Sequence, residues 1–265
     1  MFGRGGASAH ESSDPTVSRS AAAALFPREP RGPAVRVIDL AFDVTQIELP
    51  LEDVQNSRKI WNHVDELRVD ATVAAHLARN GIRVGVATAS AWGPIRAILE
   101  VVGAEVRRDE LIPSRGLPLA VQLGSLVDGD SVFAYSGSGR LIGKTFPGGE
   151  KVIGLEYVHR PQFGGAIDVG VQWEIRRDKN EVTWETRDGT VQPASSVDRH
   201  VFSDLAGHLT LNPTDFLVIG LGADAKNPYL IGPRFLSSER AGKRTETMLM
   251  ITPRTREATG ARRGS

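Results

Sequence analysis

The sequence lacks cysteine altogether among its 265 residues. Disulfide bonds and thiolate metal sites are therefore excluded. It also lacks an excess of charge of either sign, because 32 Lys and Arg residues balance 32 Asp and Glu residues. A chain this balanced has no overall attraction to nucleic acid or to an anionic membrane, so we expect no nucleic-acid partner and leave association with the cell envelope open.

Long apolar runs are missing as well, since none approaches the roughly 20 residues that cross a bilayer as a helix. The best candidate for a targeting segment, Ala21 to Phe26, is shorter than the roughly 7–15 apolar residues of a secretory signal. We therefore expect a cytoplasmic chain, or one associated with the periplasm or outer membrane if an export signal is missing from this sequence.

What the sequence does have is enough apolar residues, 40%, for a sizeable core. Residues 1–33 are rich in Gly, Ser, Ala, Pro and Arg and predict a disordered leader, and residues 255–265 predict a disordered tail. Between them we expect an α+β fold. It consists of a small β-α-β-α module over 34–110 and a mostly antiparallel β region over 111–254.

Helix signals lie in the first of these regions. Asp70 is a candidate N-cap of a helix that ends at Asn80-Gly81, because its carboxylate can accept free amides of the first turn. Ser90 is a candidate cap of a second helix, which Gly103 ends. Strands are expected at Val35–Phe42 and Ile82–Val86.

Alternation of apolar and polar residues dominates the second region and is cleanest from Ile167 to Ile175. This alternation predicts a sheet with one buried face. We expect a hairpin turn at 178–180, which would make Trp173 and Trp184 cross-strand neighbours. Further turns are expected at 128–130, 136–139 and 147–149.

The last strand, which ends at Arg254, has apolar residues on both faces, with Leu249 and Ile251 on one and Met248 and Met250 on the other. Such a strand is either central in the core or in contact with another copy of the chain. The residues that we expect in interaction surfaces are Trp61, Trp92, Tyr229, Phe235, Met248 and Met250.

Signals for catalysis are weak. The Gly-rich run Phe216–Gly222 lacks the spacing and the following helix of a nucleotide-binding loop, so no cofactor is predicted. A metal-dependent hydrolase using His63, Asp65, Glu66 or His159 is one alternative. Another is a soluble ligand- or peptide-binding module, with a site where the two regions meet. That site would be lined by Trp61, Trp92 and the pair Arg107-Arg108.

Three segments near the C-terminus resemble the end of the secretin domain, the family of ring-forming outer-membrane channels of bacterial secretion systems and pilus machines. Leu217–Gly222 is similar to its "viGGl" turn, and Pro228–Phe235 to its "P-x-x-G-x-x-F" segment. Glu246–Arg254 is similar to its terminal strand "E-L-L-I-x-I-T-P-R". The usual second Pro/Gly repeat before the aromatic residue is absent.

The resemblance implies a non-enzymatic structural or assembly protein of the bacterial cell envelope. It would be secretin-like, would belong to a secretion or pilus-type machine, and would associate with protein partners or with itself. The expected association is through sheet edges and strand surfaces.

Overall fold

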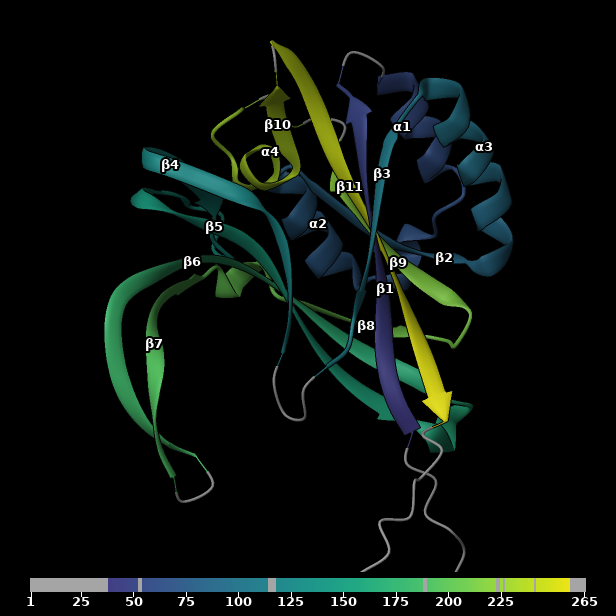
Figure 1. The fold of residues 1–265 in the computed structure, drawn as a ribbon. Coiled ribbons are helices and arrows are strands. Elements are labelled where there is room, and N and C mark those ends of the chain that lie inside the picture. Colours follow the sequence, from purple (N-terminus) through teal and green to yellow (C-terminus); the bar gives the residue numbers. More distant parts are fainter. Residues whose placement is uncertain are drawn as a thin grey trace, which may run out of the picture. The chain divides into compact units, whose positions relative to one another are not determined.

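The computed structural model describes residues 38–51, 54–113, 118–187, 190–222, 225, 227–240 and 242–257. All of them belong to one compact unit, Ile38–Ala258. The predicted leader and residues 258–265 of the predicted tail lie outside the described residues, whereas residues 255–257, also predicted to be disordered, are the end of a strand, Lys243–Glu257. The described chain is mostly antiparallel β, as the sequence predicts (Figure 1).

Sheet A joins strands from both ends of the described chain, in the order β2-β9-β11-β1-β3, with β10 paired to β11. Its strands come from both sides of residue 110, where we placed a domain boundary, and that boundary stays a prediction. The members of sheet A are β1 (Ile38–Pro50), β2 (Ile82–Thr88), β3 (Glu105–Leu111), β9 (Asp215–Leu221), β10 (Ser237–Arg240) and β11 (Lys243–Glu257).

Sheet B is built from long strands that curve strongly in Figure 1. Their order is β4-β5-β6-β7, and β8 pairs with the first part of β6. The members of sheet B are β4 (Leu119–Tyr135), β5 (Leu141–Arg160), β6 (Ala166–Arg187), β7 (Thr190–Val201) and β8 (Gly207–Leu211).

Three predicted turns of this region are wrong, because the strands continue through them. Residues 128–130 lie within β4, 147–149 within β5 and 178–180 within β6. The pairing register shifts at the first and the third, so the extra residues form bulges. Trp173 and Trp184 therefore lie on the same strand, and Trp173 pairs with Ile153 on β5. The turn predicted at 136–139 is present between β4 and β5.

The helices follow the local capping signals only in part. The Asp70 carboxylate accepts the amides of Thr72 and Val73, and Gly103 ends α3 with a φ of 61°, both as predicted. The Ser90 cap is wrong, since α3 follows a short turn and its N-cap residue, Ala91, makes no side-chain bond. The described helices are α1 (Val54–Trp61), α2 (Ala71–Arg79), α3 (Trp92–Val102) and α4 (Ile231–Leu236), with 3₁₀ turns at Glu66–Arg68, Ala89–Ala91, Pro161–Phe163 and Ser203–Leu205.

Apolar side chains bury both faces of sheet A. On one face they form a large cluster with sheet B that includes Trp173, and on the other a smaller cluster with α1 and α3. Strand β11 contributes Leu249 and Ile251 to the first cluster and Met248 and Met250 to the second. The predicted facing of this strand is therefore confirmed, and the chain itself covers both faces.

Candidate functional site

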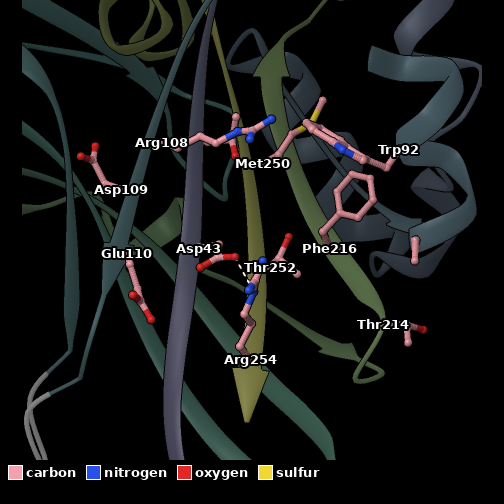
Figure 2. Close-up of a pocket in the computed structure, with 12 residues that line it drawn as sticks. Asp43, Trp92, Arg108, Asp109, Glu110, Thr214, Phe216, Met250, Thr252 and Arg254 are labelled. Carbon is pink, nitrogen blue, oxygen red and sulfur yellow. Dashed lines mark ion pairs between the residues drawn. The ribbon is translucent and has the colours of Figure 1, made fainter. Parts of the chain in front are cut away.

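A pocket of about 490 Å³ opens on the helix-covered face of sheet A, beside the start of α3. Figure 2 shows its wall and floor. The lining side chains come from the strands β1, β3, β9 and β11 and from the region around the start of α3. They are Asp43, Thr45, Ala89, Trp92, Arg108, Asp109, Glu110, Thr214, Phe216, Met250, Thr252 and Arg254.

The pocket forms where the apolar sequence of β11 ends. Met248 and Met250 lie in the cluster under α1 and α3. The next two residues on the same face of the strand are Thr252 and Arg254, which are polar and lie outside that cluster. The floor therefore changes from apolar to polar along one strand.

The wall of the pocket is aromatic. The rings of Trp92 and Phe216 meet edge to face, with centroids 6.2 Å apart and planes at 88°. Such a pair is more favourable than its buried area alone suggests. The Arg108 guanidinium lies 5.7 Å from the centre of the Trp92 ring, within the range of a cation–π contact.

The floor is polar and partly paired. Asp43 and Arg254 form an ion pair, drawn as a dashed line in Figure 2. Thr45 lies between Arg108 on β3 and Met250 on β11 in the strand register. Only 9% of Thr45 is exposed. A ligand here would meet an apolar wall on one side and hydroxyl and charged groups on the other.

The sequence hypotheses predicted some of these residues but not their grouping. Trp92, Arg108 and Met250 line the pocket, whereas Trp61 is buried in the cluster under α1, where Arg83 lies 4.4 Å from its ring centre. Phe235 and Met248 are buried in the two cores, and Tyr229 is about half exposed. The lining residues that sequence reasoning missed are Asp43, Thr45, Ala89, Asp109, Glu110, Thr214, Phe216, Thr252 and Arg254. Only the tertiary fold brings them together, so no local sequence signal could have revealed them.

A second concave region, the edge groove, has a volume of about 640 Å³ and lies between β3 and the first part of β4. These are end strands of the two sheets: β3 pairs only with β1, and β4 only with β5 among the described strands. Across the groove, Gln46 Nε2 donates to the carbonyl of Gln122 at 3.0 Å. Farther along β4, Phe133 donates its amide to the Tyr229 carbonyl. The Gln46 side chain therefore reaches the edge of the first part of β4, but no described strand pairs with this edge.

The side chains proposed for metal-dependent catalysis do not gather. Within the described ranges no three His, Asp or Glu side chains are grouped as a metal site would require. Asp65 accepts the amide of Leu67 as a cap, and Glu66 pairs with Arg83. His63 is exposed, and His159 lies on β5.

Three buried charged groups have structural partners. Burial acts to raise the pKa of Glu174, but hydrogen bonds from Arg199 and Arg176 outweigh it, and the pKa is lowered. Burial raises the pKa of Glu246, which accepts the Leu221 amide at 3.0 Å. Burial, and then the charge of Arg234, lowers the pKa of Lys151. None of the three lines the pocket beside Trp92.

No protein-family model matches the chain, and no curated protein matches it. A solved structure to which it is similar is the InvG secretin domain beta-barrel from the Salmonella SPI-1 injectisome NC-base, at 10% identity and a TM-score of 0.25. The match covers 86% of this chain and 65% of that one, so this chain spans about two thirds of its length. No described helix is long and apolar enough to cross a membrane.

Proposed function

We propose that this protein is a non-enzymatic assembly protein of the bacterial cell envelope. It is secretin-like, serves a secretion or pilus-type machine, and binds copies of itself or protein partners through its sheet edges. The observation that carries the proposal is the edge groove, because backbone amides and carbonyls that none of the described strands pairs with are a ready template for strand addition.

The segments that resemble the secretin domain give further support. Strands β9 and β11, which carry two of them, pair directly, with Leu249 opposite Ile219. The third segment includes α4, whose Ile231 and Phe235 join the core between the sheets. The three segments thus form one packed region. The envelope location follows from the resemblance of these segments.

The edge groove offers a specific test of association. The Gln122 carbonyl accepts from Gln46 on the open side of β4, and residues two apart on a strand point the same way. The amide of Ala120 therefore faces the groove. Proline at this position removes a donor from the open edge without removing a bond to β5.

The experiment compares the wild type with Ala120→Pro and Ala120→Val by mass photometry and crosslinking at micromolar concentration. Oligomers that form in the wild type and in Ala120→Val but are lost in Ala120→Pro would support assembly through this edge. A wild type that stays monomeric under all conditions and crosslinks to no partner in native cells would contradict the proposal. Fractionation of native cells tests the location, with an envelope fraction expected.

A further inference from the structure

We propose that the pocket beside Trp92 is a binding site for a small aromatic carboxylate. Its volume of about 490 Å³ lies within the range of about 300–1,000 Å³ that is usual for small-molecule sites. A flat ring bound in this pocket would contact the aromatic side chains of Trp92 and Phe216. It would also contact the polarisable thioether of Met250. The proposal does not rest on the proposed assembly through the edge groove, although Asp109 and Glu110 line both regions.

The charge that selects a carboxylate is that of Arg108. Its guanidinium lies over Trp92, and within the described part of the chain no ion pair links it to an Asp or Glu. Its neighbours in the sequence, Arg107 and Asp109, differ from it because they form an ion pair with each other. Arg107 pairs with Asp109 at 2.9 Å, and in Figure 2 Asp109 points away from the aromatic wall. An arginine that is stacked on a ring and has no anion can form two parallel bonds to a carboxylate.

A hydroxyl next to Arg108 strengthens the assignment. Thr45 is 9% exposed, lines the pocket and directly opposes Arg108 in the strand register. A threonine hydroxyl can donate one hydrogen bond, and a carboxylate oxygen is a strong acceptor. A carboxylate over Thr45 would accept from both the hydroxyl and the guanidinium.

The acidic residues of the lining do not cancel this charge. Asp43 is held by Arg254 in an ion pair. Glu110 lies two residues beyond Arg108 on β3 and opposes Asp43 in the strand register. In Figure 2 its side chain extends away from Trp92. Beside the aromatic wall the nearest charge is therefore positive. The ring of the ligand would contact Trp92 and Phe216, and its anionic group would point toward β3.

The test uses 2-naphthoate as the probe and 2-naphthamide, which has the same ring but no charge, as its partner. Isothermal titration calorimetry of the wild type should show saturable binding of one 2-naphthoate per chain and weaker binding of the amide. Arg108→Gln should raise the Kd for 2-naphthoate about tenfold or more, since a bond to a charged group is lost. Thr45→Val should raise it about two- to tenfold.

Arg107→Gln is the matched control, because it removes the same charge from the adjacent residue, whose side chain lies on the other face of β3. It should leave the Kd for 2-naphthoate unchanged. Circular dichroism and melting temperature confirm that each variant is folded. The proposal is overturned if 2-naphthoate shows no saturable binding up to millimolar concentration. It is equally overturned if the amide binds as well as the acid, or if Arg107→Gln weakens binding as much as Arg108→Gln.

Discussion

Strands β11 and β3 lie in the same sheet, one strand apart, and differ in almost every physical respect. Strand β11 has neighbours on both sides, and Met248, Leu249, Met250 and Ile251 are each no more than 2% exposed. Strand β3 pairs only with β1 among the strands that the structure describes, and it carries the run Arg107-Arg108-Asp109-Glu110. Strand β11 is therefore held in the core, whereas one edge of β3 has no described strand paired to it.

This difference separates stability from association. The apolar residues on both faces of β11 are covered by sheet B on one side and by α1 and α3 on the other, so they need no second chain to bury them. The open backbone and the charged side chains of β3 border the edge groove and the pocket beside Trp92. We therefore expect substitutions in the centre to change folding, and substitutions at the edge to change binding.

The largest expected effect is that of Trp173→Ala in the centre of sheet B. Trp173 is 0% exposed and meets Phe235 at 5.6 Å between ring centres. Its removal should lower the free energy of unfolding by about 3–5 kcal/mol, because it leaves a large cavity between the sheets. Urea melts measure this loss, and Val158→Ala on β5, at a half-exposed position, is the control. A cost near zero would mean that the space between the sheets is not a packed core.

Met248→Ala should come next, with a loss of about 2–5 kcal/mol of unfolding free energy. Met248 is 0% exposed and packs in the smaller cluster, where its methyl group lies close to Gly220. Thr255→Ala, at an exposed position of the same strand, should cost about 0.5 kcal/mol or less. If the two variants unfolded alike in urea, β11 would not be the central strand that the comparison requires.

The sequence signals that predicted the structure correctly are those that depend on contacts between residues close in the sequence. Asp70 caps a helix because its carboxylate reaches amides two and three residues away, and Gly103 ends one because it adopts a positive φ. Ser90 failed because its hydroxyl instead bonds that of Thr88, at 2.8 Å. The turn signals inside sheet B failed because Gly129 and Gly148, both with positive φ, lie inside bulged or bent strands.

The candidate site was less predictable than the fold. Trp92 and Arg108 stood out by residue type, yet the same reasoning also selected Trp61, which is buried in the helix-covered cluster. Asp43 and Arg254 are more than 200 residues apart in the sequence, and they form an ion pair because β1 pairs with β11. Such long-range register is not visible in a single sequence.

Glu174→Gln should have a smaller effect that depends on pH. Hydrogen bonds from Arg176 and Arg199 lower the pKa of this buried carboxyl below its ordinary value of 4.5. The charged form therefore stabilises the fold above pH 4.5, and that contribution is lost as the pH falls through the folded-state pKa. The variant should cost about 1–2 kcal/mol at pH 7, because Arg199 is partly in solvent and screening reduces the gain.

Urea melts at several pH values measure this difference, which should shrink at acidic pH. Val158→Ala, at a half-exposed position of β5 and without a titratable group, is the control, and its cost should not change with pH. A gap between wild type and Glu174→Gln that stays constant down to pH 3 would show that the carboxylate gains nothing from its two arginines.

The smallest expected effect is that of Arg107→Ala at the open edge of sheet A. The Arg107 side chain is 73% exposed, and its ion pair with Asp109 is screened by water. Exposed pairs of this kind usually contribute about 0–1 kcal/mol, so the unfolding free energy should fall by about 0.5 kcal/mol or less. Urea melts against Met248→Ala measure the contrast directly. A loss as large as that of a core residue would mean that β3 is as firmly held as β11. The Arg107 side chain would then be held by contacts beyond its ion pair with Asp109, and the contrast between the end strand and the central strand would fail.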